Sequence, residues 1–335
     1  MEESQQKALA YEMSRTLLVE KQFRDICRMA EGVCRLVPLK GIDLATSFYG
    51  NSLERTVGDI DLLAYPEEGA VAFVRKLRAE GGYVPQFDYL DSEAALRVKR
   101  KTCLRPQPTA LRTDVDIHLA FVTKKFFSRS QQAFNRDAVA RLRHESGAVY
   151  RMDAVDRWLY LAQHAAFHHF SAPKWSKDLI DLGDAMTANE LELLASRARV
   201  YNMERVCRYA VERLAGEAPR PWLSALRGAG RAPLWLRYLL KDGQGGRKWY
   251  HFIAKPFWEF VFIARRRDRW RAYFALFFPA PAMLCSIYRR RMTWHYACYY
   301  PMHALVSLIG AGLFALVYLA VALPKKENEG FGMGN

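Results

Sequence analysis

The sequence lacks the cysteine and signal patterns that mark secreted, disulfide-stabilised or zinc-binding proteins. Its six cysteines are scattered, and no two of them form a Cys-x-x-Cys pair. This spacing predicts neither a disulfide framework nor a zinc site. Residues 1–20 are polar and hold no apolar segment of the kind that a signal peptide requires. We therefore expect reduced thiols in the cytoplasm.

The first half of the chain also lacks an excess of positive charge. Residues 1–190 carry 27 Lys and Arg against 26 Asp and Glu, whereas residues 191–295 carry 21 against 7. A nearly neutral N-terminal half offers no basic groove for a nucleic-acid backbone, which argues against nucleic acid as a partner. The basic excess lies directly before the most apolar stretch of the chain and indicates a membrane surface.

That apolar stretch, Met302–Leu323, runs for 22 residues without a formal charge. A helix of this length measures about 33 Å, close to the hydrocarbon thickness of a bilayer. The alternative, a buried core helix, usually keeps a polar stripe, and this segment has none. The segment therefore predicts a transmembrane helix.

The flanking charges predict the orientation of this helix. The arginines within 265–271 and 289–291 outnumber Lys325 and Lys326, which follow the span. The positive-inside rule then places the N-terminal part in the cytoplasm, as a single-pass protein. Two further apolar segments, 252–264 and 272–288, suit interfacial or re-entrant positions, and a hairpin of two spans remains an alternative.

Strand-like and helix-like segments alternate before residue 125, and helical patterns dominate after it, which predicts an α+β fold. We expect a small mixed sheet with helices, then a helical region, then the transmembrane helix. The expected strands are 35–39, 59–65 and runs within 83–104 and 110–121, and the expected helices are 5–32, 42–49, 67–80, 155–170, 177–186, 191–214 and 222–240. The expected domains are a core at 1–125, a helical domain completing the cleft at 126–242, a basic membrane-proximal segment at 247–300 and the span at 302–323.

Acidic residues stand two apart in two of the expected strands. Gly58 precedes Asp59 and Asp61, and the later strand contains Asp114, Asp116 and His118. Strand side chains alternate between faces, so each acidic set points to one side. Neighbouring carboxylates repel one another unless a cation lies between them. Two such sets on adjacent strands predict a site for hard divalent cations, of which Mg²⁺ prefers these oxygen ligands.

Five short motifs, taken in order along the chain, resemble those of the uncharacterised nucleotidyltransferase family of the polymerase-β superfamily. The resemblance covers about residues 20–190. It rests on Leu39-Lys40-Gly41, Tyr49, the run from Arg55 through Gly58-Asp59-Ile60-Asp61-Leu62-Leu63, Asp116-Ile117-His118, and the helical set His164, His168, Trp175 and Asp181.

The resemblance implies a polymerase-β-like core and transfer of a nucleoside monophosphate from an NTP to an acceptor. Asp59 and Asp61 would bind two magnesium ions, with manganese as the alternative ion. Asp116 would be the third metal ligand and would orient or accept the proton of the acceptor hydroxyl. Two metal ions align the attacking oxygen and stabilise the leaving pyrophosphate.

The resemblance also implies a nucleotide-binding turn. Lys40 and Gly41 stand where other superfamily members have a Gly-Ser turn that holds the triphosphate. Lys40 and Arg55 are candidate phosphate-binding charges, with ion pairs to nearby acids as the alternative, and Gly58 precedes the first acidic set. His118 is either a supporting partner of the metal site or an exposed strand residue.

The histidines of the helical region allow a rival interpretation. His164 and His168 lie one turn apart, with Asp178 and Asp181 following. Read alone, they suggest a metal centre of the HD-phosphohydrolase type, but the chain has no His-Asp dipeptide. We expect His164 and His168 first to pack two helices together through Asp178 or Asp181. The second expectation is that they line the cleft, together with His118 and Asp181.

Three functions therefore remain open. The first is a nucleotidyltransferase at the cytoplasmic membrane face. The second is an inactive membrane-tethered nucleotide-binding or scaffold protein, although three unpaired carboxylates weigh against a dead site. The third is a metal-dependent phosphohydrolase that uses His164 and His168. The membrane anchor suggests a membrane-associated acceptor, and the sequence leaves the acceptor, the base preference and the oligomeric state undetermined.

Overall fold

The fold was determined as a computed structural model, which describes most of the chain up to residue 215 and part of the C-terminal region. The described residues are 2–50, 55–86, 91–107, 112–122, 129–215, 265–279 and 298–322, together with scattered positions between 220 and 288. Several sequence-based expectations concern segments outside these ranges: most of 222–240 and 252–264, and the arginines 289–291.

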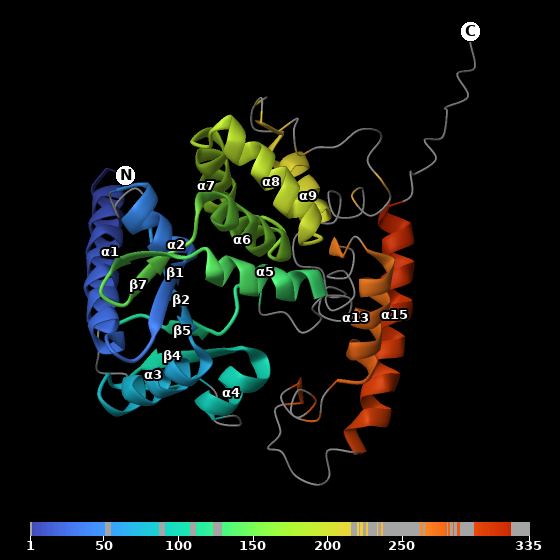
Figure 1. The fold of residues 1–335 in the computed structure, drawn as a ribbon, viewed down its shortest axis with the longest axis horizontal. Coiled ribbons are helices and arrows are strands. Elements are labelled where there is room, and N and C mark those ends of the chain that lie inside the picture. The colour runs from blue at the N-terminus through green and yellow to red at the C-terminus, as the bar shows by residue number, and fades with distance from the viewer. Residues whose placement is uncertain are drawn as a thin grey trace.

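A seven-stranded mixed sheet forms the centre of the molecule (Figure 1), in the order β3-β4-β5-β2-β1-β7-β6. Strand pairs β2–β5 and β1–β7 are parallel, and the other neighbouring pairs are antiparallel. This confirms the α+β class. The strands are β1 (Arg35–Leu39), β2 (Ile60–Tyr65), β3 (Tyr83–Pro85), β4 (Lys101–Pro106), β5 (Val115–His118), β6 (Arg143–Ser146) and β7 (Val149–Arg151).

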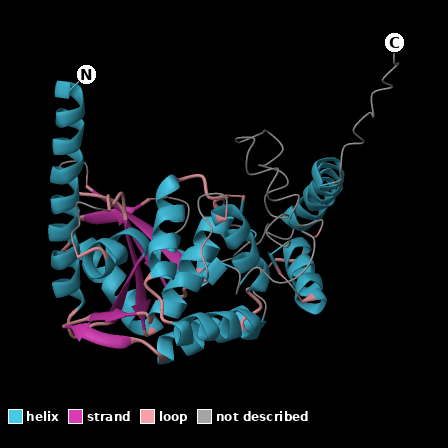
Figure 2. Cartoon of the chain, turned by 90° about the horizontal axis from the view of Figure 1, so that it is seen from above, coloured by secondary structure: helices cyan, strands magenta, loops and turns pink. Residues whose placement is uncertain are grey.

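The helices lie on both sides of the sheet (Figure 2). They are α1 (Glu2–Ala30), α2 (Lys40–Asp43) with a π-helical turn (Leu44–Phe48), α3 (Glu67–Ala79), α4 (Ser92–Lys99), α5 (Arg129–Ala140), α6 (Ala154–Phe167), α7 (Pro173–Asp184), α8 (Ala188–Val200) and α9 (Glu204–Leu214). The expected helix over 191–214 is broken in two, because Asn202 adopts a left-handed backbone conformation between α8 and α9.

Two elements were not expected from the sequence. Helix α4 lies inside the segment interpreted as strand-like, where Asp91 caps its first turn by accepting a hydrogen bond from the Glu93 backbone. Strands β6 and β7 form a hairpin within the region that appeared helical throughout, and Gly147 provides the left-handed turn between them. The sheet therefore contains strands from both sides of residue 125.

Alternation along the strands produces two cores, one on each face of the sheet. Leu36, Ile60 and Leu62 pack with α1 and α3 on one face. Val37, Leu39 and Leu63 point to the other face, where α5, α6 and the later helices cover them. Because Asp61 lies between Ile60 and Leu62, the strand period directs it to the face covered by the helical region.

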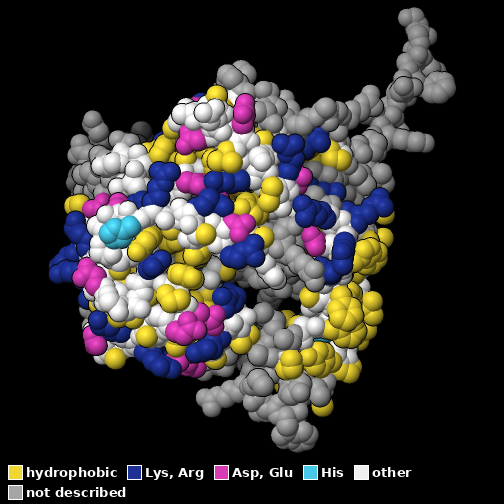
Figure 3. Space-filling model, viewed as in Figure 1, with side chains coloured by type: hydrophobic (Ala, Val, Ile, Leu, Met, Phe, Trp, Pro, Cys, Tyr) yellow, Lys and Arg dark blue, Asp and Glu magenta, His cyan; other side chains and the backbone are white. Residues whose placement is uncertain are grey.

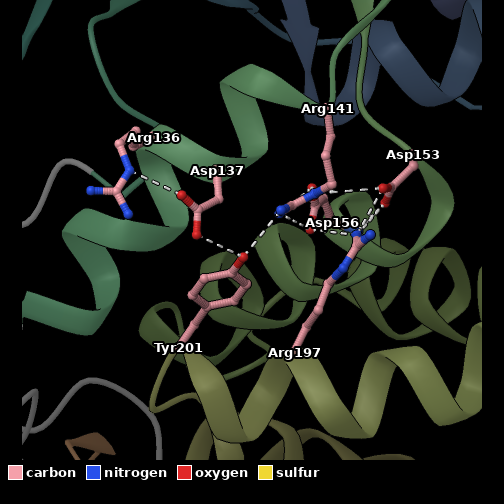
Figure 4. A network of polar contacts seen from close by, with 7 residues as sticks. All are labelled: Arg136, Asp137, Arg141, Asp153, Asp156, Arg197 and Tyr201. Carbon is pink, nitrogen blue, oxygen red and sulfur yellow. Dashed lines mark hydrogen bonds and ion pairs between the residues drawn. The ribbon is translucent and has the colours of Figure 1, made fainter.

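Buried ion pairs join the sheet layer to the helical region. Asp43 of α2 is 1 % exposed. Its carboxylate accepts from Arg151 at 2.7 Å and pairs with Arg157 at 2.9 Å. Sequence analysis had assigned Asp43 no role, and the structure shows that it connects α2 to β7 and α6. A second network links α5, α6 and α8 (Figure 4), through Asp137, Arg141, Asp153, Asp156, Arg197 and Tyr201.

The C-terminal part contributes α13 (Arg266–Phe277) and α15 (Tyr299–Ala322), which lie side by side at one edge of the molecule (Figures 1 and 2). Among the described residues, α15 is the helix long and apolar enough to span a membrane. Its polar His303 faces inward and bonds the Leu276 carbonyl at 2.8 Å. Outward side chains are apolar, and hydrophobic residues gather over these two helices in the space-filling view (Figure 3).

We predict that Asp43→Asn destabilises the protein strongly. The substitution leaves two poorly exposed guanidinium groups without their shared carboxylate, so we expect the free energy of unfolding to fall by about 3–5 kcal/mol. Urea unfolding followed by tryptophan fluorescence would measure this change. The matched control is Glu93→Gln, which breaks a surface pair with Arg75 and should cost about 1 kcal/mol or less. Similar losses in both variants would contradict the assignment of Asp43 as a buried connector.

Candidate active site

The pairing of β2 with β5 brings the two acidic motifs of the sequence together. The two strands run parallel, and Asp61 stands opposite Asp116 in their register. Residues directly opposite one another across two strands share one face of the sheet. Two carboxylates that are 55 positions apart in the sequence thus lie side by side under the helical region.

The neighbouring strand adds polar partners on the same face. In the antiparallel β4–β5 pair, Cys103 is opposite Asp116 and Lys101 is opposite His118. The Lys101 ammonium forms an ion pair with Asp116. The His118 Nε2 atom lies 3.2 Å from an Asp61 oxygen. His118 is therefore a buried partner of the carboxylate and not an exposed strand residue.

Lys40 neutralises the most deeply buried carboxylate. Its backbone adopts a left-handed conformation, with φ at 53°, at the point where β1 turns into α2. The Lys40 ammonium lies 2.6 Å from Asp61, which is 1 % exposed. Burial by itself would raise the pKa of Asp61, but the Lys40 charge and the His118 hydrogen bond outweigh it and lower the pKa below its usual range. Asp61 is therefore ionised at neutral pH.

Asp59 stands at the rim of the same site, one residue before β2. Its side chain lines the cleft, and its position is exposed. Partial burial and the nearby negative charges of Asp61 and Asp116 raise the pKa of Asp59, although Lys40 acts in the opposite direction. Such repulsion between carboxylates is relieved when a cation binds between them.

Three of these side chains can hold a metal ion. One ligand atom from each of Asp61, Asp116 and His118 lies within 4.8 Å of the other two. The Asp116 Oδ1 and His118 Nδ1 atoms are buried and have no hydrogen-bond partner in the part of the chain that the structure describes. Burial lowers the pKa of His118, so its ring is neutral at pH 7 and offers a nitrogen lone pair. Two carboxylates and an imidazole fit a divalent cation, with Asp59 close by at the rim.

These groups line one cleft of about 490 Å³ between the sheet and helices α6 and α7. That volume falls within the range of small-molecule sites. The cleft brings together most of the residues that the sequence had singled out: Lys40, Gly41, Arg55, Gly58, Asp59, Asp116, His118, His164, His168 and Trp175. Asp61 lies beneath its surface.

Arg55 reaches across the cleft and binds α7. Its guanidinium donates to Asp178 at 2.8 Å from both Nε and Nη2, and both side chains are buried. The Tyr49 hydroxyl donates to Asp181 at 2.9 Å and contacts Asp178 at 3.2 Å. The ion pair that sequence analysis held as the alternative for Arg55 is therefore present, and it fixes the position of α7. Asp181, expected as a cleft residue, belongs to this network.

The two histidines pack on an aromatic ring of α7. The ring centroids of His164 and His168 lie 5.4 Å and 5.2 Å from that of Trp175. The expectation that they join two helices holds in outline, but Trp175 is their packing partner, while Asp178 and Asp181 bind Arg55 and Tyr49. Burial lowers the pKa of His164 well below its usual value, so the ring is neutral. This packed arrangement gives no support to the phosphohydrolase interpretation.

Sequence analysis missed several residues that line the cleft, among them Lys101, Tyr160, Gln163 and Lys174. Lys101 becomes visible only once the β4–β5 register is known, because its neighbour across the strands is His118. Tyr160 and Gln163 precede His164 on α6, and Gln163 is a polar residue within a buried helical segment. This polar residue at a buried helical position was the feature of the sequence that could have identified Gln163.

A family model described as "Uncharacterised nucleotidyltransferase" matches residues 2–215, which is more than half of the chain. The matched region contains the whole sheet and helices α1–α9, and therefore every residue of the cleft described above. Comparison with curated proteins and with solved structures gave no match.

We predict that His118 contributes to the binding of a divalent metal ion when no nucleotide is present. Replacing His118 with Asn removes the imidazole that contacts Asp61, and we expect the affinity for Mn²⁺ to fall about 10- to 100-fold. Titration of the purified full chain with Mn²⁺, followed by electron paramagnetic resonance, would measure the affinity. His144→Asn, an exposed histidine on β6, is the matched control and should bind as the wild type does. Equal affinity in both variants would remove His118 from the metal site.

Proposed function

The chain belongs to the uncharacterised nucleotidyltransferase family, and from this membership and the geometry of the cleft we propose that it transfers a nucleoside monophosphate from an NTP to an acceptor at the cytoplasmic face of a membrane. We propose with it that residues 1–125 form a polymerase-β-like core, to whose sheet β6 and β7 add two strands, and that residues 126–242 complete the cleft. The observation that carries the proposal is the register of β2 and β5, which places Asp61 and Asp116 side by side with Asp59 at the rim.

We propose that Asp59, Asp61 and Asp116 hold two magnesium ions, with His118 supporting Asp61 or replacing Asp59 as a ligand. When bound, the ions would neutralise the triphosphate and stabilise the departing pyrophosphate. The protein contributes positions fixed in advance: Asp61 and Asp116 are set by strand register, and Lys40 and Lys101 limit the repulsion between them. This is catalysis by orientation and electrostatics.

In the proposed reaction the acceptor hydroxyl attacks the α-phosphorus of the NTP. The new bond joins the acceptor oxygen to phosphorus, and the bond from the α-phosphorus to the oxygen that bridges to the β-phosphate breaks. Pyrophosphate leaves with that bonding pair. The hydroxyl proton passes to Asp116, whose Oδ1 atom has no hydrogen-bond partner among the described residues. A carboxylate near the attacking oxygen suits this role as proton acceptor.

Cations of the cleft would hold the triphosphate. Lys40 and Gly41 lie at the turn into α2 and Gly58 at the approach to β2, so their backbone groups border the space above the carboxylates. Lys174 adds an ammonium at the start of α7 that lines the cleft, and no carboxylate lies within 4 Å of it among the described residues. Arg55 would mainly hold the wall in place, with the N–H groups left over from Asp178 available to a phosphate.

We propose that α15 anchors the enzyme as a single membrane span with the N-terminal part in the cytoplasm. Apolar side chains of α15 point outward, including Leu308 and Ile309, which are 61 % and 55 % exposed. Helix α13 carries exposed aromatic rings at Trp270 and Phe274 beside its arginines, a composition typical of an interfacial helix. The anchor favours an acceptor that is itself membrane-associated.

The activity is tested with the full chain in detergent. We expect Mg²⁺-dependent binding of α-³²P-labelled NTP, and transfer of label to a component of a membrane extract. Asp59→Asn, Asp61→Asn and Asp116→Asn should each lower the transfer about a hundredfold or more, because each removes a charge from the reacting centre. Asp114→Asn is the matched control, since Asp114 pairs with Arg105 at 3.7 Å outside the cleft, and it should retain transfer.

Nucleotide binding without transfer to any acceptor, unchanged in the three Asp variants, would favour the inactive nucleotide-binding or scaffold protein. Absence of NTP binding in a folded wild-type protein would contradict the proposed substrate itself.

The membrane anchor is tested by two arginines near the middle of α15. Leu308→Arg combined with Ile309→Arg should raise the free energy of insertion by about 5–7 kcal/mol. We expect the wild type to resist extraction by alkaline carbonate and the double variant to be released into the supernatant. The control, Leu308→Ala with Ile309→Ala, keeps the segment apolar and should remain in the membrane. Extraction of the wild type would rule out a spanning helix.

A further inference from the structure

Gln163 is a buried residue of the cleft whose side chain is unsatisfied. It lies on α6, is 4 % exposed, and lines the same cleft as Asp59 and Asp116. Neither its amide nitrogen nor its amide oxygen has a hydrogen-bond partner among the described residues. A glutamine amide carries two donor hydrogens and one acceptor oxygen. Buried amides are almost always hydrogen-bonded, so this one, unpaired among the described residues, is available to a ligand bound in the cleft.

The surroundings of Gln163 suit a flat heterocycle. The next residue, His164, packs edge-on against Trp175, with the rings at 88°. His168 lies 5.2 Å from the same indole. Together these rings form an aromatic part of the cleft wall, and His164 is neutral because burial lowers its pKa. Aromatic rings bind nucleobases by stacking, without regard to which base is present.

We propose that Gln163 is the residue that selects the nucleobase of the NTP: its amide hydrogen-bonds the edge of a base that contacts the Trp175 wall. This inference rests on the proposed function, because it assigns the base end of the same nucleotide. The residues that line the cleft then divide by chemistry. Lys40, Lys174 and the carboxylates serve the triphosphate, whereas Gln163 carries no charge.

An uncharged amide fits a base edge better than a phosphate. A phosphate accepts hydrogen bonds but has no donor for the Gln163 oxygen, so one amide atom would stay unsatisfied. A base edge presents a donor beside an acceptor, and an amide can satisfy both at once. Stacking alone would bind all bases alike, so selection between them requires a group that reads the edge.

The test measures binding of ATP, GTP, CTP and UTP, each with Mg²⁺, to the full chain in detergent by isothermal titration calorimetry. Inorganic tripolyphosphate with Mg²⁺ serves as a probe without a base. Gln163→Met keeps the length and volume of the side chain but removes both hydrogen-bonding atoms. We expect the wild type to prefer one base, and Gln163→Met to weaken binding of that NTP about 10- to 100-fold while the others change little. Binding of tripolyphosphate should be unchanged.

Two controls test whether a change in the ranking of the NTPs is specific to Gln163. Gln107→Met alters an exposed glutamine just after β4, outside the cleft, and should keep the wild-type ranking of the four NTPs. The thermal midpoint of Gln163→Met should equal or exceed that of the wild type, because the variant removes an unsatisfied buried amide. A retained midpoint shows that any loss of ranking is not a loss of fold.

An unchanged ranking of the four NTPs in Gln163→Met would overturn the proposal. It would indicate that a bound water satisfies the amide. Equal loss for all four NTPs and for tripolyphosphate would also overturn it, since that pattern assigns Gln163 to the triphosphate or to the shape of the cleft. If the wild type binds neither NTP nor tripolyphosphate, the proposed function itself fails, and the base site fails with it.

Discussion

The repulsion between Asp61 and Asp116 is the constraint on which the rest of the site depends. Strand register alone brings these two carboxylates together on one sheet face, and burial makes each charge costly. Lys40, Lys101 and His118 supply the compensation from three different strands or strand ends. These partners stabilise the two carboxylates in the folded chain, while the Asp116 Oδ1 atom keeps no hydrogen-bond partner among the described residues.

A second set of buried charges joins the elements around the cleft. Arg55 binds Asp178 across the cleft, and Asp43 binds two arginines of the hairpin and α6. Both pairs join the sheet to the helical region, and breaking a buried pair leaves an uncompensated charge. Several residues of the family motifs therefore have a structural role: Tyr49, Arg55 and Asp181 position α7. Helix α7 in turn presents Trp175 and Lys174 to the cleft.

The sequence predicted the parts of this site that follow a local period. Asp61, Asp116 and His118 could be placed on strand faces because side chains alternate with a period of two. Lys101 could not, since its role depends on which strand pairs with β5 and in which register. Helix α4 and the β6–β7 hairpin were missed for a related reason: both are short, and short segments are set by caps, turns and tertiary pairing more than by periodicity. Gln163 was missed because a single polar residue among the buried positions of α6 adds no periodic pattern.

The balance of charge in the cleft bears on how a nucleotide can enter it. Lys40 and Lys101 are paired with carboxylates, and Arg55 is paired with Asp178, so these cations are largely neutralised. Lys174 is the lining cation without such a pair among the described residues, and burial together with Arg55 lowers its pKa. One such ammonium cannot offset a triphosphate that also approaches Asp59 and Asp116. Under the proposed function, a nucleotide would therefore enter together with divalent cations, and the carboxylates that would repel the free triphosphate would hold the metal–nucleotide complex.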